Sequence, residues 1–214
     1  DAAIERAFIQ VVAGGIPSGC DIEVAYGNPN SPYCPFPPRF NDNALRLVND
    51  GSLLCVYVGH GATTGVASVL WNGEAYPVLR KPDAKKVEVK EGLPVMIVLA
   101  CSTGKIDAEQ DCIAEEFVRV ARGPVAFLAG SRITTPYGNA LLGEALATEF
   151  FGEGRTLGEV LTRAKQRVLT HDKSLFNQQA DFLGSQQAGL EALEPMRQDV
   201  VRHYNLLGDP ALVL

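Results

Sequence analysis

Residues 52–61, SLLCVYVGHG, are the strongest fold signal in this sequence. They make a short, almost continuous apolar run that stops at glycine, and residues 94–104, PVMIVLACSTG, repeat this pattern. Such runs are typical of strands that are buried on both faces of a parallel sheet. In open α/β sheets, ligands bind beyond the carboxyl ends of the strands, and the two runs place His60 and Cys101 there. We therefore predict that an imidazole and a thiol share one crevice.

The composition is that of one well-buried globular domain, which we expect to span residues 1–214. The chain is 46% hydrophobic, which is enough for one core. Its net charge of -6 and the lack of a Lys/Arg cluster argue against nucleic acid as a partner. No apolar stretch approaches the roughly 20 residues of a membrane span. The amino terminus has no basic region, so we do not expect a signal peptide there.

The segments before and after the first run have their own signals. We predict an amphipathic helix over residues 2–13, a strand over 21–26 and an irregular proline-rich loop over 27–40. A short helix capped by Asn41 or Asp42 should end at Gly51. After the first run, Asn72-Gly73 lies between short apolar segments and indicates a hairpin outside the main sheet. The charged segment 82–90 should be exposed.

The second half alternates between strand and helix patterns. We expect a helix over 108–122 with Asp107 as its cap, a third core strand over 125–130, and a helix over 137–151. Thr156 and Glu159 have the spacing of a capping box, residues 174–204 read as partly helical, and the last segment reads as an edge strand. This order predicts a three-layer α/β/α sandwich with a mostly parallel central sheet.

Cys101 and His60 together would supply the chemistry of acyl transfer. A thiol needs an adjacent imidazolium to become a thiolate, and the imidazole can then protonate the leaving amine. The backbone N–H groups of Gly61 and Cys101 would be the oxyanion donors. We expect no metal, because no CxxC or HxxxH pattern is present, and no nucleotide cofactor, because no glycine-rich phosphate motif is present. His171 and His203 should be solvated or capping residues.

The other four cysteines have structural interpretations. Cys55 and Cys112 lie in apolar patterns and should be buried, inert thiols. Cys20 and Cys34 lie in a Gly/Pro-rich region, where they either pair, which would indicate an oxidising compartment, or stay as two thiols. Sequence alone does not choose between these alternatives.

These motifs resemble a known family. A strand ending Gly-His-Gly, a second ending Ala-Cys-x-x-Gly, and the terminal Leu-Leu-Gly-Asp-Pro-Ala-Leu are together similar to the gingipain-type cysteine peptidases, peptidase family C25, which belong to the same clan as caspases. The resemblance covers residues 40–214. It implies a caspase-like fold, a secreted or cell-surface location, no cofactor, and a protein or peptide substrate cleaved by an endopeptidase.

The resemblance also implies roles for individual residues. Cys101 would be the nucleophile of a thioester acyl-enzyme mechanism, His60 the general acid and base, and Gly61 with Cys101 the oxyanion hole. The loop after the third strand would bind the substrate backbone and the P1 side chain through Ser131, Arg132, Ile133 and Thr134. Arg132 either lines the S1 pocket and favours acidic P1 residues, or points to solvent.

Two departures from the family pattern bear on these expectations. Gingipain catalytic domains carry a further α/β subdomain before the histidine strand, whereas 59 residues precede His60 here. A third residue that orients His60 is not identified; the upstream acids considered for this role are Asp1, Asp21 and Glu23. The alternatives are a CHAT-type caspase-like peptidase and a catalytically inactive binding module with the same fold.

Overall fold

The structure is a computed structural model that describes residues 16–152, 155–171 and 174–214. The chain divides into two compact units. The sheet unit comprises residues 21–133 and 205–208, and the helical unit comprises 134–204, 209–214 and the described part of 1–20. The helix predicted over residues 2–13 lies outside the described residues. A single domain over 1–214 stays a prediction.

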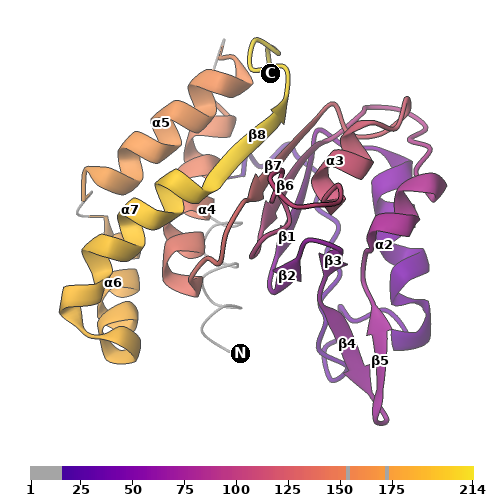
Figure 1. Cartoon of the computed structure of the whole chain (residues 1–214), viewed down its shortest axis with the longest axis horizontal. Helices are drawn as coiled ribbons and strands as arrows, with labels where there is room; N and C mark the ends of the chain where they lie inside the picture. Colours follow the sequence, from indigo (N-terminus) through magenta and orange to yellow (C-terminus); the bar gives the residue numbers. More distant parts are fainter. Residues whose placement is uncertain (1–15, 153–154, 172–173) are drawn as a thin grey trace. The chain divides into compact units, whose positions relative to one another are not determined.

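A four-stranded sheet organises the sheet unit. Its strands are β1 (Leu54–Val58), β6 (Val95–Leu99), β7 (Ala126–Gly130) and β8 (Tyr204–Gly208), side by side in the order β1-β6-β7-β8 (Figure 1). β1 and β6 are parallel, and so are β6 and β7. The predicted α/β class with a mostly parallel sheet is confirmed, and so is the edge strand near the carboxyl terminus.

The burial of the strands follows their place in the sheet. Every residue of β6 and of β7 is buried, as predicted. The same prediction is wrong for β1, in which Val56 is 44% exposed and Val58 is 40% exposed. Because β1 is an edge strand of this sheet, one of its faces keeps contact with solvent while the other, with Cys55 and Tyr57, packs against the core.

Two helices contribute to the core on one face of the sheet. α2 (Phe40–Asp50) and α3 (Ile113–Val118) bury their apolar side chains in a cluster with Met96, Val98 and Phe127. The rings of Phe117 and Phe127 meet edge to face with centroids 6.3 Å apart. α2 ends at Gly51, as predicted, where the backbone has a φ of 87° that favours glycine.

Asn41 is not the cap that we predicted for α2. The helix begins at Phe40, with Arg39 at the N-cap position and no side-chain cap, so Asp42 is not the cap either. The Asn41 amide instead donates 2.9 Å hydrogen bonds to the Val78 carbonyl and to Asp83. A tertiary contact has thus taken the side chain that local pattern assigned to capping, and a 3-10 turn at Pro37–Arg39 interrupts the proline-rich loop.

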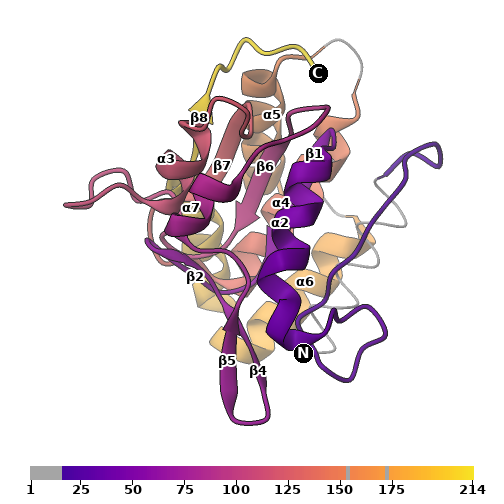
Figure 2. The same cartoon turned by 90° about the vertical axis from the view of Figure 1, so that its right-hand side faces the viewer.

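The predicted hairpin lies outside the main sheet. β4 (Ser68–Trp71) and β5 (Glu74–Pro77) pair antiparallel around Asn72 and Gly73, whose φ values are 50° and 81°. Positive φ at both turn residues is typical of the type I′ turn that Asn-Gly favours. The hairpin extends beyond the strands of the sheet (Figure 2), and β2 (Gly61–Ala62) with β3 (Gly65–Val66) forms a second short antiparallel pair.

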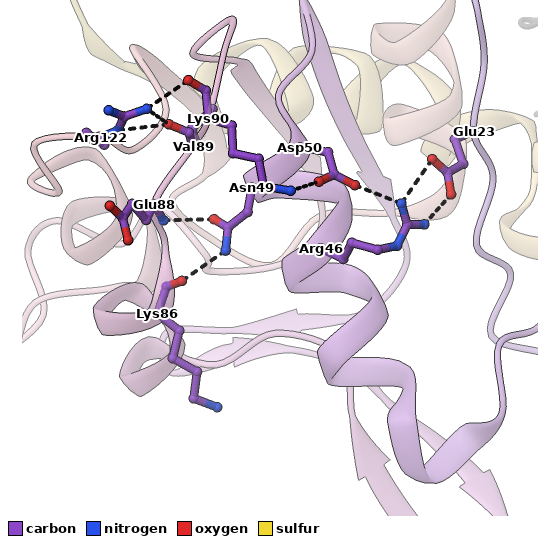
Figure 3. A network of polar contacts seen from close by, with 9 residues as sticks. All are labelled: Glu23, Arg46, Asn49, Asp50, Lys86, Glu88, Val89, Lys90 and Arg122. Carbon is purple, nitrogen blue, oxygen red and sulfur yellow. Dashed lines mark hydrogen bonds and ion pairs between the residues drawn. The ribbon is translucent and has the colours of Figure 1, made fainter.

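The prediction that residues 82–90 are exposed is wrong for much of that segment. A 3-10 helix, η2 (Lys81–Lys86), buries Asp83, and Val89 beyond it is fully buried. The Asn49 side chain explains the attachment, because it donates to the Lys86 carbonyl at 3.0 Å and accepts from the Glu88 N–H at 2.8 Å (Figure 3). Lys85, Lys86, Glu88 and Lys90 are exposed, while the backbone is held against α2.

Two further predictions from the sequence, a strand over residues 21–26 and a long helix over 108–122, are wrong. Residues 21–26 form no strand, since the Tyr26 N–H bonds to the Tyr33 carbonyl and Glu23 forms an ion pair with Arg46 (Figure 3). The helix expected over 108–122 is only the six residues of α3, with Cys112 at its N-cap position and Glu115 accepting from the Cys112 N–H. The residues between Cys101 and α3 form an irregular loop instead.

The helical unit contains α4 (Pro136–Phe150), α5 (Leu157–Leu169), α6 (Leu175–Ala188), the 3-10 turn η3 (Leu190–Ala192) and α7 (Leu193–His203). These match the predicted helices closely, and the Thr156–Glu159 capping box is present at the start of α5. The carbonyls of Pro210 and Leu212 accept from the first amides of α5, at 2.8 Å each. In the described part of the chain, no helix has the length and apolar character to cross a membrane.

Candidate active site

The parallel pairing of β1 with β6 places the ends of the two sequence motifs side by side at the carboxyl edge of the sheet. Val58 is the register partner of Leu99, and the Gly59 N–H extends the pairing with a 3.3 Å bond to the Leu99 carbonyl. His60 follows Val58 by two residues, and Cys101 follows Leu99 by two residues. The two residues therefore lie just beyond the carboxyl ends of adjacent strands.

Gly61 makes the direct contact between these strand ends. A Cβ atom at Gly61 would lie 2.7 Å from Thr103 Cγ2, 2.8 Å from Ala100 Cβ and 2.9 Å from the Cys101 carbonyl oxygen. Contacts under 3.0 Å between such atoms are not tolerated, so only glycine allows the His60–Gly61 backbone to approach the Cys101 backbone this closely. The structure thus brings His60, Gly61 and Cys101 together.

The chain turns sharply directly after Cys101. Ser102 has a φ of 54°, a left-handed conformation that costs a non-glycine residue about 1 kcal/mol. Its N–H donates to the Arg132 carbonyl at 3.0 Å, which holds this turn against the loop that follows β7. Cys101 stays half-buried and His60 is exposed, so incoming molecules can reach the imidazole.

The hydrogen bonds of the β2–β3 pair leave the Gly61 amide unused by that ladder. Gly61 faces Val66, but the Ala67 N–H donates to the His60 carbonyl at 3.0 Å and the Val66 N–H donates to Leu79. This is the pattern of a non-hydrogen-bonded antiparallel pair, in which the facing residues do not exchange bonds. The Gly61 N–H is therefore directed away from β3.

The loop after β7 is linked to the loop after β6 by an ion pair. Arg132 donates a two-pronged hydrogen bond to Asp107, at 2.9 and 2.7 Å, and also donates to the Ser131 carbonyl at 2.8 Å. The sequence suggested that Arg132 either lines the S1 pocket or points to solvent, and neither interpretation included an ion pair with Asp107. Ser131 is buried and Ile133 is 79% exposed, whereas Thr134 belongs to the helical unit.

Asp107, which we predicted as a helix cap, is a partner for Arg132 instead. The hydrogen bonds from Arg132 lower the pKa of the Asp107 carboxyl from its ordinary value of 3.8. A group with a lowered folded-state pKa contributes stability above its unfolded pKa and loses it as the pH falls through the folded value. The ion pair is therefore complete near neutrality, and a decline of activity in mild acid would not come from Asp107.

The remaining cysteines differ from Cys101 in their surroundings. Burial raises the pKa of the Cys55 thiol to about 11, and burial also raises the pKa of Cys112, so both thiols favour the protonated form. Cys112 is buried, as predicted, whereas Cys55 is only half-buried. Cys20 is exposed, Cys34 is half-buried, and in the described residues these two form no disulfide. Among the described residues, no cluster of histidine, cysteine and carboxylate side chains fits a metal ion.

Sequence reasoning missed three residues of the site. The Tyr57 hydroxyl donates to the His60 carbonyl at 2.9 Å. Thr103 is fully buried beside Gly61, and its Oγ1 has no hydrogen-bond partner in the described part of the chain. Asp107 reaches Arg132 across 25 residues of sequence. The two opening motifs contain Tyr57 and Thr103, but no pattern assigned a role to either, and none pointed to the Asp107–Arg132 pair.

Comparison with known proteins identifies the family. The model of peptidase family C25 matches residues 1–214. The chain belongs to peptidase family C25. The resemblance inferred from the Gly-His-Gly and Ala-Cys-x-x-Gly motifs is confirmed, and the match favours the gingipain-type family over the CHAT-type alternative. No curated protein matches the chain.

Solved structures show the same fold. The chain is similar to the Arg-specific cysteine proteinase gingipain R, with a TM-score of 0.60, 17% identity, and coverage of 100% of this chain and 41% of the other. It is also similar to the complex of the pro- and mature domains of RgpB from Porphyromonas gingivalis, with a TM-score of 0.54, 16% identity, and coverage of 100% and 42%. The C25 chain thus spans less than half the length of these proteins and has a gingipain-like, caspase-type α/β sandwich fold.

Proposed function

We propose that this C25 chain carries the catalytic centre of a cysteine endopeptidase, with Cys101 as the nucleophile and His60 as the general acid and base. One observation carries the proposal. Gly61 packs closely against the Ala100 side chain and the Cys101 carbonyl, so the residues that flank this contact meet at the carboxyl end of a parallel sheet. A thiol and an imidazole carried by these neighbouring strand ends would supply the minimum apparatus for nucleophilic catalysis.

The proposed reaction passes through a covalent thioester. His60 holds the proton of the Cys101 thiol, and the thiolate sulfur attacks the carbonyl carbon of the scissile peptide bond. His60 returns the proton to the leaving amine as the C–N bond breaks. A water molecule, deprotonated by His60, then attacks the thioester and releases the carboxylic acid product and the thiol.

The negative charge on the tetrahedral intermediate needs backbone donors. We assign this role to the N–H groups of Gly61 and Cys101. The Gly61 amide is suited to it because the β2–β3 ladder does not use it and because glycine has no side chain of its own to obstruct a substrate. The narrow contact with Thr103 and Ala100 keeps this amide beside Cys101.

Site-resolved alkylation tests the proposal. We expect trace iodoacetamide to label Cys101 much faster than Cys55 or Cys112, because a thiolate is the reactive form and burial raises the pKa of the other two thiols. In the His60→Ala variant, labelling of Cys101 should fall by about tenfold or more as the activating imidazole is lost. Mass spectrometry of each cysteine peptide over time gives the rates.

The exposed Cys20 is the internal reference for this experiment, because its labelling should be equal in the two proteins. Should Cys101 react no faster than Cys55, or equally fast in both proteins, the chain is instead a binding module that has kept the fold without the catalysis. The His171→Ala variant is the matched control, since His171 pairs with Glu194 in the helical unit.

We also propose that Ser131, Arg132, Ile133 and Thr134 bind the substrate. The Asp107 carboxylate neutralises Arg132, so we expect Asp107→Asn to expose the positive charge to the P1 side chain. Cleavage after acidic P1 residues should rise about two- to fivefold relative to neutral ones, the effect of one exposed charge pair. A fluorogenic library with varied P1 residues measures the preference.

The Asp111→Asn variant is the control for the P1 experiment. Asp111 lies in the same loop and pairs with Arg119, so its replacement removes one negative charge without releasing Arg132. An unchanged P1 profile in Asp107→Asn, or an equal shift in both variants, would show that Arg132 does not contact the P1 side chain.

A further inference from the structure

The His60 imidazole has no carboxylate partner in the described part of the chain. Of the upstream acids considered from sequence, Glu23 forms an ion pair with Arg46, Asp21 is exposed, and Asp1 lies outside the described residues. His171 does form a histidine ion pair, with Glu194, but none reaches His60 within the described ranges. The hydrogen bonds that hold His60 are instead made to its backbone.

Tyr57 supplies one of these backbone bonds. Its hydroxyl donates to the His60 carbonyl at 2.9 Å and accepts from the Ala67 N–H at 3.3 Å. The same Ala67 N–H donates to the His60 carbonyl at 3.0 Å, so the three groups close a small triangle. Tyr57 thus links the end of β1 to the first residue after the β2–β3 pair.

The phenol ring also determines the path of the backbone between Val58 and His60. A Cβ atom at Gly59 would lie 2.6 Å from the Tyr57 hydroxyl and 3.0 Å from its Cζ, so the ring lies directly over the glycine. Burial raises the pKa of Tyr57, and the Ala67 hydrogen bond opposes this less strongly. The hydroxyl therefore stays protonated and remains a donor to the His60 carbonyl.

We propose that Tyr57 is a positioning residue, whose hydroxyl holds the His60–Gly61 backbone beside the Cys101 backbone. The proposal rests on the function proposed above. Beyond the Val58–Leu99 register pair, the sheet adds only the 3.3 Å bond from the Gly59 N–H, so the strand end needs a second restraint. Tyr57 provides it from within β1, and within the described residues no carboxylate orients the imidazole.

The Tyr57→Phe variant removes the donor and keeps the ring over Gly59. The His60 carbonyl and the Ala67 N–H remain bonded to each other, so no buried group loses its last partner and the fold should persist. We expect kcat to fall about five- to tenfold with KM unchanged, which corresponds to one hydrogen bond. Amide hydrogen exchange should become faster in residues 59–67 and stay unchanged in the β4–β5 hairpin.

Two comparisons separate positioning from a general structural effect. Tyr76→Phe, which removes a tyrosine bond to Glu74 in the hairpin, should leave kcat and the exchange of residues 59–67 unchanged. In the His60→Ala background, Tyr57→Phe should not slow the alkylation of Cys101 further, since its effect passes through His60. An undiminished effect in that background would overturn the proposal, as would wild-type kcat and exchange in Tyr57→Phe.

Failure of the proposed function would give a different result. In that case iodoacetamide would label Cys101 equally fast in wild type and in His60→Ala. Amide hydrogen exchange would then be the test of the role proposed for Tyr57. Faster exchange over residues 59–67 in Tyr57→Phe would then still support its hold on the His60 backbone, and unchanged exchange would refute it.

Discussion

We expect the Cys101→Ala variant to lose about 10⁴-fold or more of the peptidase activity while remaining folded. In the proposed mechanism Cys101 forms the thioester bond, so no other group can replace it in that step. Cys101 is only half-buried, and removing one sulfur atom from such a site changes stability little. Turnover of a fluorogenic peptide library with mixed P1 residues, together with a thermal melt, gives both quantities.

A matched cysteine substitution makes the result specific. Cys20→Ala removes an exposed thiol from the helical unit and should leave turnover unchanged. The double variant Cys101→Ala with His60→Ala should be no less active than Cys101→Ala alone, because groups that act as a unit are not additive. Residual turnover in Cys101→Ala within tenfold of wild type would remove Cys101 from the mechanism.

The second large effect is expected at Gly61. In the Gly61→Ala variant the added methyl group would collide with Thr103, Ala100 and the Cys101 carbonyl, at 2.7 to 2.9 Å. Since two of these contacts involve groups on the β6 side of the site that cannot rotate away, the two strand ends must separate. We expect kcat/KM to fall about 10²-fold or more, as a displacement near 1 Å or the loss of one oxyanion donor would cause.

Gly19→Ala is the control for this substitution, because a Cβ atom there meets nothing within 4 Å. A Gly61→Ala/Thr103→Ser double variant removes the methyl group of Thr103 and should recover part of the activity. Wild-type activity in Gly61→Ala with an intact fold would contradict the close approach of these strand ends.

The patterns along the sequence determined much of the architecture. Apolar runs that stop at glycine located β1, β6 and β7, Asn72-Gly73 located the hairpin, and Thr156 with Glu159 located the start of α5. These signals are local, since each depends on the periodicity or turn preference of a few neighbouring residues. The motifs that identified peptidase family C25 were equally local, and they placed His60 and Cys101 after two strands.

The edge or central position of each strand, and the burial of its neighbours, became apparent in the tertiary structure. It made β1 an edge strand with one exposed face, kept Val89 buried in a charged segment through Asn49, and left residues 21–26 without a strand partner. Such outcomes depend on partners far away in the chain, and residue patterns do not contain those partners.

The candidate site likewise has features that the sequence predicted and features that only the structure revealed. Residue patterns along the sequence were enough to identify the thiol, the imidazole and the glycine of the site, because these are chemical identities at motif positions. The tertiary structure decided that Gly61 touches Cys101, that Asp107 engages Arg132, and that Tyr57 holds the His60 carbonyl. These contacts arise from strand register and loop paths, which form only when the hydrophobic core brings distant segments together.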